Sequence, residues 1–412
     1  MSIFTTPFSQ LRTADLYELL TGGAVENVRL EFKLEVPNKD ETLKKLSSFA
    51  NTFGGFMVVG AKANSADGRI EALPGVEVQA GYKQKVVQWC FDGASPPLTV
   101  EVSDPIPTTA DDGRVCYVIS TLESDVAPHF LNGRKGVWLR TDEFSSRYEA
   151  RLADEMELRH LFDRRKAIVE RRADLLHRAR RRFDTYIERT TGSRTGNRTP
   201  WPRLELSVVP RFPARPLCEQ ERLKHLIENK QLPWRQTRFP VFNTGAVSQH
   251  ESAIILRPTG DMSICEGNIW GLLFYGTGIE DNHGGTVGIH PYAVAGYLLL
   301  FLRHATEILE ELGFSGPLLV HTTLTSIFNH QWLDPRSGVG FYVRPGTSQL
   351  DDEIAFSVDS TSDVMREDRD RIARDLLRYV FFSVNWADLI STPGGLEALI
   401  GWGKNYNFWG QH

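Results

Sequence analysis

Residues 28–33 alternate between apolar and charged side chains, with Val, Leu and Phe at 28, 30 and 32 and Arg, Glu and Lys at 29, 31 and 33. In a β-strand this alternation places the two kinds of side chain on opposite faces. The apolar face predicts packing onto a core. The charged face must meet water, a metal or an anionic ligand, so this strand is the first candidate for a functional surface.

The segment after this strand predicts a helix and a second strand. Asn38 or Asp40 can cap a helix that runs to Thr52. Apolar side chains at helical spacing predict one buried stripe, made of Leu43, Leu46, Phe49 or Ala50, and Phe53. Gly54 and Gly55 end the helix where a left-handed turn costs glycine little. The apolar run 56–59 predicts a strand that is buried on both faces.

Shorter patterns predict the other elements of an N-terminal domain over residues 1–153. They are a helix over 14–20 capped by Thr13, a helix over 82–91, antiparallel strands over 98–102 and 115–119 around a loop at 105–113, and a hairpin of 129–131 with 137–140. Asn132-Gly133 supplies the hairpin signal. We therefore predict an α+β domain, a mixed sheet with helices on it.

A long helix over residues 154–190 keeps an apolar period of 3.6 residues. From Arg164 to Arg198 the chain has twelve Lys or Arg against four acidic residues, a net charge of +8. Since the whole chain carries −5, the rest carries −13. Such a basic arm is typical of a phosphate footprint. The run is densest at Arg178, Arg180, Arg181 and Arg182. A helix face that pairs with an acidic neighbouring domain explains the same run equally well.

Residues 154–200 therefore read as a basic helix followed by a flexible linker, and residues 201–412 as a second α+β domain without a catalytic motif. We predict strands at 204–209, 252–256, 262–265, 270–275, 320–327, 341–343 and 353–358, and helices at 219–228, 291–312 and 363–386. Its scattered histidines favour core or surface positions over a metal site. The segment 275–278, Tyr-Gly-Thr-Gly, predicts a turn. The aromatic segment 402–409 fits a docking tail or a core strand.

Composition sets outer limits on function. The 412 residues are 41% hydrophobic and 24% charged, as in ordinary globular domains. With a net charge of −5, any affinity for nucleic acid must come from a local patch. The four cysteines lie far apart, which argues against a zinc ribbon and indicates reduced thiols. We see no signal peptide and no apolar run long enough for a bilayer, and we expect a cytoplasmic protein.

Separate groups of residues resemble a known family. Glu26-x4-Glu31-Phe32-Lys33, followed by Phe49-Ala50-Asn51-Thr52-x-Gly54-Gly55-x4-Gly60, resembles the core of the Schlafen-like, divergent AlbA family of nucleic-acid-binding domains. The segments 137–144 and 158–165 are similar to the closing hairpin and helix of that domain. The resemblance covers about residues 10–165 and says nothing about the remainder.

The resemblance implies binding of nucleic acid and, in the nuclease members, cleavage of tRNA or related RNA. Two glutamates and an aspartate hold a divalent cation in those members. Glu26 and Glu31 stand at the glutamate positions, so they are the candidate ligands for Mg²⁺ or Mn²⁺ and, with Lys33 and Asp67, the candidate catalytic residues. For Glu31 and Lys33 the alternative is a surface ion pair on an edge strand.

The third metal ligand departs from the family pattern. Lys62 and Ala63 stand where the aspartate is expected, and an ammonium there would repel a cation. Asp67 replaces that ligand only if its loop folds back. Otherwise Asp67 is an ordinary turn residue before Gly68.

The sequence thus predicts a protein that binds RNA of a tRNA-like kind or single-stranded DNA, with bacterial phage defence as one setting. The candidates for phosphate contact are Arg29, Lys33, Lys44, Lys45, Arg140, Arg178, Arg180, Arg181 and Arg182. Relatives with two such modules form a clamp and this chain carries one, so the resemblance implies a homodimer or higher assembly. The alternatives are a metal-dependent endoribonuclease and a protein-interaction scaffold or ligand sensor. The sequence leaves open whether the protein is an enzyme.

Overall fold

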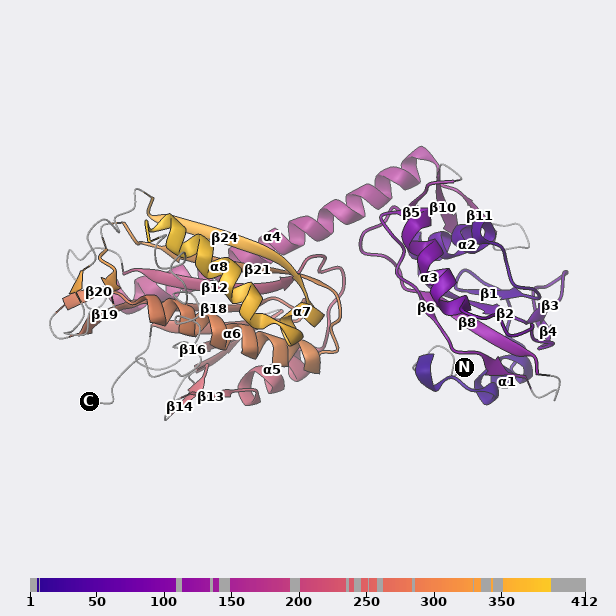
Figure 1. Cartoon of the computed structure of the whole chain (residues 1–412), viewed down its shortest axis with the longest axis horizontal. Coiled ribbons are helices and arrows are strands. Elements are labelled where there is room, and N and C mark those ends of the chain that lie inside the picture. Colours follow the sequence, from indigo (N-terminus) through magenta and orange to yellow (C-terminus); the bar gives the residue numbers. More distant parts are fainter. Residues whose placement is uncertain are drawn as a thin grey trace. The chain divides into compact units, whose positions relative to one another are not determined.

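The computed structural model divides into two compact units, residues 1–167 and 168–412, both drawn in Figure 1. It describes residues 6, 8–108, 113–133, 136–140, 149–192, 201–234, 237–240, 246–250, 252–257, 262–283, 286–328, 330–334, 342–343 and 351–386. Each unit combines helices with sheets, so the fold class is α+β as predicted. The boundary falls within the basic helix, inside the segment predicted to connect the two domains.

The predicted charged strand lies at the edge of a mixed sheet in the first unit. β1 (Leu30–Lys33) pairs in parallel with β2 (Gly55–Val59), and β2 pairs antiparallel with β8 (Val115–Thr121). The order is β1-β2-β8-β6, where β6 is Glu101–Val102, and β7 (Ile106–Pro107) also pairs with β8. A parallel pair needs a crossover, which α2 (Lys39–Asn51) supplies. The predicted strand, helix and strand are confirmed.

The ends of α2 show which part of its predicted stripe is correct. Asn38 caps the helix by accepting a hydrogen bond from the backbone N–H of Glu41 at 2.9 Å, and the stripe is buried as far as Ala50. The helix ends at Asn51, so Phe53 no longer follows the helical period. Its side chain is 57% exposed, and its predicted place in the core is wrong.

A glycine turn explains where the chain goes next. Gly54 has φ +67°, and a Cβ at this position would come within 2.7 Å of the backbone N of Glu123. Only glycine fits a left-handed conformation with so little space. The turn leaves Phe53 on the surface and starts β2 one residue later.

A second, antiparallel sheet completes the first unit. Its order is β11 (Ala150–Leu152), β10 (Gly136–Arg140), β9 (Phe130–Leu131) and β5 (Ala94–Ser95). The pairing of β9 with β10 confirms the predicted hairpin. The smaller elements are the 3-10 turn η2 (Phe8–Gln10), α1 (Thr13–Thr21), β3 (Lys62–Ala63), β4 (Ile70–Ala72) and α3 (Tyr82–Gly93).

Two local predictions in this unit need correction. The hydroxyl of Thr13 does not cap α1, because it donates to the carbonyl oxygen of Pro107 at 2.7 Å, and Asp15 instead accepts from the backbone N–H of Arg12 at 2.8 Å. The strand expected over 98–102 is only β6, and β7 lies within the expected loop at 105–113.

The long basic helix is present as α4 (Glu155–Gly192). Asp154 and Glu157 cap its start reciprocally, since each carboxylate accepts from the other's backbone N–H, at 2.9 and 3.0 Å. The buried positions of its stripe are Leu161, Ile168, Leu175, Ala179, Phe183 and Ile187. Phe162 also fits the apolar period of the predicted helix, but its side chain is 48% exposed.

The second unit is built on one antiparallel sheet of seven strands. In order these are β15 (Ala246–Gln249), β16 (Ala253–Arg257), β17 (Ser263–Asn268), β18 (Leu273–Gly278), β12 (Arg203–Pro210), β21 (Pro317–Thr325) and β24 (Glu353–Thr361). The other elements are α5 (Gln220–Asn229), α6 (Pro291–Glu311), α7 (Ser362–Glu367), α8 (Arg369–Ser383), and the ribbons β13 (Leu232–Trp234) with β14 (Thr237–Phe239), β19 (Glu280–His283) with β20 (Thr286–Ile289), and β22 (Leu333–Asp334) with β23 (Tyr342–Val343).

Helices cover both faces of this sheet. α6 and α8 pack on the face that carries Leu206 and Tyr275, and they lie in front of the sheet in Figure 1. The second part of α4 packs on the opposite face, where Phe183 contacts Phe274. A Cβ on Gly276 would meet the Phe183 ring at 2.7 Å. Glycine is therefore needed inside β18 for this close packing, and the turn predicted at 275–278 is wrong.

Two further predictions for this unit change. The helix expected over 363–386 is two helices, because Asp368 leaves the helical conformation and caps α8 through the backbone N–H of Arg371 at 3.2 Å. The strand expected from 270 begins at Leu273, since a turn at Gly271 precedes it. The linker predicted over 190–200 begins later than expected, because α4 continues to Gly192, and residues 193–200 lie outside the described residues. The segment 402–409, for which we predict a docking tail or a core strand, also lies outside them. Among the described helices, none combines the length and apolar character that crossing a membrane requires.

Candidate nucleic-acid interface

Glu31 is the centre of a cluster of cations in the first unit. Its side chain is 6% exposed, although the alternation in β1 predicts an open charged face. One carboxylate oxygen lies 2.9 Å from Nζ of Lys45 and 3.2 Å from Nζ of Lys33, and the other accepts from Nη1 of Arg140 at 2.5 Å. We call these four residues, with Glu41, the Glu31 cluster. Lys33 reaches Glu41 at 2.6 Å.

Arg140 is held in this position from three sides. Its side chain is 1% exposed, and its remaining donors reach the carbonyl oxygens of Asn27 at 3.0 Å and Leu30 at 3.2 Å. Its guanidinium lies over the ring of Phe49, 4.9 Å from the centroid. Arg140 therefore joins β10 to β1 and α2. A guanidinium this buried and this fully bonded is structural, so Arg140 is not open to a phosphate.

The cations determine the ionisation of Glu31. Burial alone would raise its pKa, but Arg140, Lys45 and Lys33 outweigh burial and lower the pKa to about 2. The pKa of Lys33 is raised, because Glu31 and Glu41 outweigh the opposing effect of its own burial. Glu31 and Lys33 are thus both charged at neutral pH. Lys33 and Lys45 stay partly accessible, with side chains 22% and 12% exposed.

Glu26 lies beside this cluster but is not part of its ion pairs. Its carboxylate accepts a hydrogen bond from the backbone N–H of Phe32 at 2.9 Å. Burial raises its pKa, and the charge of Glu31 adds to that rise. The backbone N–H of Glu26 donates to the carbonyl oxygen of Gly68 at 3.0 Å, so the loop that carries Asp67 does fold back beside Glu26.

Asp67 nevertheless acts as a turn residue in this loop. Its side chain is exposed and accepts from the backbone N–H of Arg69 at 3.0 Å. Lys62, the residue at the expected aspartate position, pairs with Glu71 at 3.0 Å. The structure therefore supports the turn interpretation of Asp67.

The donor set of this site does not fit the divalent cation that the nuclease members of the family hold. A Mg²⁺ or Mn²⁺ ion needs several oxygen ligands with little positive charge nearby. Glu31 is instead engaged by three cationic side chains. Within the described ranges, no three His, Cys, Asp or Glu side chains come together as a metal site.

Lys44 and Arg29 flank the cluster. Lys44 Nζ lies over the Trp138 ring, 4.3 Å from the centroid, and Arg29 is exposed at the start of β1. Trp138 lies on β10, two residues before Arg140. These two flanking cations add to the positive charge around the partly exposed Lys33 and Lys45.

The arginines predicted as the densest phosphate footprint lie on α4 in the second unit and are mostly paired. Arg180 donates to Glu205 at 2.7 Å and to Glu353 at 2.8 Å. Arg182 holds Glu266, which is 0% exposed, through both Nε and Nη2. Arg178 pairs with Asp174 one turn away at 2.7 Å, and Arg181 is exposed. These arginines are far along the chain from the Glu31 cluster and form a separate group.

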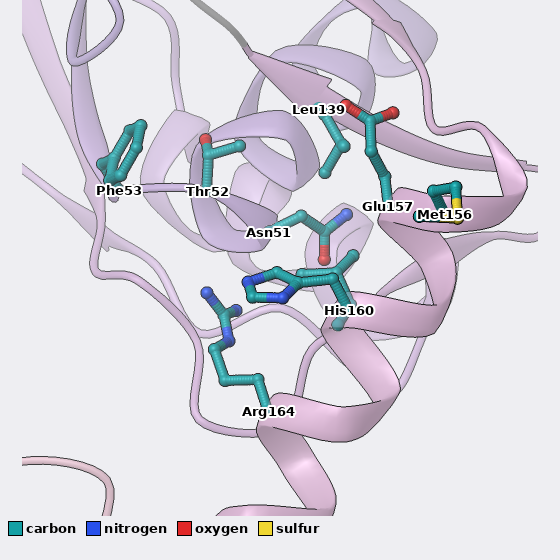
Figure 2. Close-up of a pocket in the computed structure, with 9 residues that line it drawn as sticks. Asn51, Thr52, Phe53, Leu139, Met156, Glu157, His160 and Arg164 are labelled. Carbon is teal, nitrogen blue, oxygen red and sulfur yellow. The ribbon is translucent and has the colours of Figure 1, made fainter.

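Beside the cluster, the first unit also has a hollow of about 330 Å³, drawn in Figure 2. It lies where the end of α2, β10 and the first turns of α4 meet. Its apolar wall consists of Phe53, Leu139, Met156 and Leu161. We call it the Phe53 pocket. Figure 2 shows the imidazole of His160 between the amide of Asn51 and the guanidinium of Arg164.

Several residues of these sites are missing from the sequence prediction. Glu41 and Trp138 gave no signal, because their roles depend on contacts with Lys33 and Lys44 across elements. For the pocket a partial signal existed, since His160 and Arg164 stand four residues apart and so share a face of α4. Phe53 fits the helical period of α2, so the sequence predicts it in the core and gives no sign of its place in the pocket.

The buried ion cluster, the crossover helix and the partly exposed lysines define a small α+β domain with a cationic edge. Residues 26–149 match the family model described as Schlafen, AlbA_2. This part of the chain is a Schlafen-like AlbA domain, as the sequence motifs predict, and the family indicates a function related to nucleic acid. The match does not extend to the second unit. Comparison with curated proteins finds no match.

Proposed function

We propose that the Schlafen-like domain binds single-stranded nucleic acid, either RNA of a tRNA-like kind or DNA, through the partly exposed side of the Glu31 cluster. The observation that carries this proposal is the fixed position of two lysines, Lys33 and Lys45, against one buried carboxylate. An ammonium has three donors, so each lysine keeps hydrogens for a phosphate while Glu31 holds its nitrogen in place.

The local charge balance favours an anionic ligand. The ion pairs join three cations to two carboxylates, and Arg29 and Lys44 flank them. Glu26 lies beside the cluster but outside these ion pairs, since its carboxylate accepts from the backbone N–H of Phe32. Because the chain as a whole is negative, this local surplus is what can attract a polyanion.

Binding can be measured by fluorescence anisotropy with labelled single-stranded RNA and DNA over a range of salt concentrations. The test variant is Lys33→Gln with Lys45→Gln. We expect weaker binding and a slope of log affinity against log salt that is shallower by about 1.4, since each phosphate contact on a single strand contributes about 0.7.

A matched control has the same total charge as the test variant. Lys83→Gln with Lys85→Gln also removes two lysines, both from α3 of the same unit, where Lys83 pairs weakly with Asp104 at 3.5 Å. This variant should keep nearly the wild-type slope. Equal losses in both double variants would contradict a specific role for the Glu31 cluster.

Cleavage by a metal-dependent endoribonuclease is the alternative, with Glu26, Glu31 and Lys33 as its candidate residues. The cationic surroundings of Glu31 do not favour it, and we propose binding without metal-dependent cleavage. Incubation with total tRNA, with Mn²⁺ or with a chelator, should give the same intact RNA. Glu26→Gln is the informative variant, because Glu26 is outside the ion pairs. Products that need Mn²⁺ and disappear in this variant would establish the endoribonuclease.

We further propose that two copies of the chain act together in the cytoplasm, and that the setting is bacterial phage defence, with the second unit binding a partner or ligand. Light scattering should give at least twice the chain mass of 46.6 kDa. A monomer at all concentrations would remove the dimer from the proposal.

The role in phage defence has a separate test. Equal phage plating on hosts that express the wild type or the Lys33 and Lys45 variant would remove the defence role.

A further inference from the structure

The Phe53 pocket has no role in the interface described above. It lies wholly in the first unit, and its volume of about 330 Å³ is at the small end of the range for ligand sites in proteins, about 300–1,000 Å³. Its wall carries one aromatic ring, Phe53, which is 57% exposed. A large apolar side chain this exposed at the rim of a hollow is available for stacking.

The polar groups of the pocket are of two kinds. Asn51 and Glu157 are already used, since Asn51 bonds the backbone of His129 and Trp138, and Glu157 accepts both branches of Arg151. They give the pocket its shape and offer little to a ligand.

The other polar groups can face a ligand. Among the described residues, His160 is exposed and makes no hydrogen bond, and Figure 2 shows its ring inside the hollow. The hydroxyl of Thr52 donates to the carbonyl oxygen of Ser48 at 2.6 Å, which leaves its oxygen as an acceptor. Arg164 pairs with Glu123 and reaches the carbonyl oxygen of Ser124 at 3.3 Å. The hollow therefore combines one flat apolar ring with donors and an acceptor among its lining residues.

Two elements connect this pocket to the Glu31 cluster. In β10, Leu139 lines the pocket and the next residue, Arg140, binds Glu31. At the start of the first sheet, the carbonyl oxygen of the exposed Arg29 accepts from the backbone N–H of Phe56 at 2.8 Å, three residues beyond Phe53. Successive residues of a strand point to opposite faces, so Leu139 and Arg140 place the pocket and the Glu31 cluster on the two faces of the same strand, β10.

We propose that the Phe53 pocket receives one unpaired base of a single-stranded nucleic acid whose phosphates contact the Glu31 cluster. This inference rests on the proposed function. The base stacks on Phe53, and its polar edge faces His160 and Thr52. A purely apolar side chain of a protein partner would leave His160 facing it without a hydrogen-bond partner, so the polar side chains that line the pocket favour a nucleobase.

The experiment compares three labelled 12-nucleotide strands of equal charge. Two carry bases, oligo(U) and oligo(dT), and the third is abasic throughout. Phe53→Ala should weaken binding of the strands with bases by about 5- to 150-fold, as loss of a base–aromatic stack does, and should leave the abasic strand unchanged. The ratio of oligo(U) to oligo(dT) affinity shows which nucleic acid the pocket prefers.

Two further variants make the result specific. Phe91→Ala removes another exposed phenylalanine, 65% exposed on α3 of the same unit and outside the pocket, and should change none of these affinities. His160→Ala changes an exposed side chain and should weaken only the strands with bases. If Phe53→Ala and His160→Ala leave the strands with bases as tightly bound as before, or weaken all three strands equally, the base pocket is wrong and the hollow is left to a protein side chain.

Failure of this inference differs from failure of the proposed function. Binding by the wild type that depends on salt and on Lys33 and Lys45, without any effect of Phe53, overturns the pocket alone. Absence of wild-type binding to all three strands overturns both.

Discussion

In both the Glu31 cluster and α4, cationic side chains pair with carboxylates. The balance of charge is opposite in the two regions. In the first unit three cations share two carboxylates, Glu31 and Glu41. On α4 the two arginines 180 and 182 face three carboxylates, Glu205, Glu266 and Glu353. The denser basic run in the sequence is therefore the more nearly neutralised one in the fold. A run of arginines predicts a phosphate footprint only where the tertiary neighbours are not acidic.

Burial makes the second difference between the regions. Arg182 reaches down to a carboxylate on β17 that is fully covered, so this pair fixes α4 to the sheet. In the Glu31 cluster the buried guanidinium of Arg140 has the corresponding structural role, and the two lysines above Glu31 remain partly open. Four predictions test this contrast.

Arg140→Met should give the largest effect. It leaves Glu31 buried with only two lysines and removes the link from β10 to β1, so we expect a loss of about 3–5 kcal/mol in the stability of the first unit. Hydrogen exchange of the β1 and β2 amides measures that unit separately. Arg159→Met, which changes an arginine that is 67% exposed, should cost less than about 0.5 kcal/mol. Equal protection in both variants would show that Arg140 does not hold the cluster together.

The second prediction concerns pH. The pKa of Glu31 is about 2 in the folded state, below its ordinary value of 4.5. The unfolded state therefore binds the proton more readily, and the stability from this group is complete above about pH 4.5 and lost as the pH falls towards 2, by about 3 kcal/mol. Hydrogen exchange of the β1 amides between pH 5 and 2.5 measures this loss, once the observed rates are corrected for the intrinsic exchange rate at each pH. Glu31→Gln should remove this part of the pH dependence, and an unchanged profile in that variant would assign it to other carboxylates.

Arg182→Met should give a smaller loss, about 2 kcal/mol in the second unit, because Glu266 can take up a proton when its partner is gone. Burial already raises the pKa of Glu266. The deficit should therefore shrink as the pH falls towards 4.5, which urea unfolding at several pH values can follow. Arg181→Met changes the exposed neighbour on the same helix and should stay within about 0.5 kcal/mol.

The two α4 variants can also be tested for binding of single-stranded nucleic acid. Neither Arg181→Met nor Arg182→Met should alter binding of a single strand by more than about twofold, because neither lies in the Glu31 cluster. A loss as large as that of the Lys33 and Lys45 variant would restore α4 as a phosphate footprint and end the contrast between the two regions.

The sequence by itself determined the local elements and the domain family. Alternation marked β1, the helical period and Asn38 marked α2, Asn132-Gly133 marked the hairpin, and the spacing of Glu26, Glu31 and Lys33 marked the Schlafen-like domain. These signals are strong because they depend on neighbours within about one turn of helix or one strand pair.

Only the tertiary structure decided what the charges do. Arg140 meets Glu31 across 109 positions of the chain, and Arg180 meets Glu353 across 173, so no local pattern records either partner. The same is true of Phe53, whose period fits the core of α2 although the helix ends two residues earlier. Charge and aromatic rings are recognised by their surroundings in space, and a linear sequence states only which groups are present.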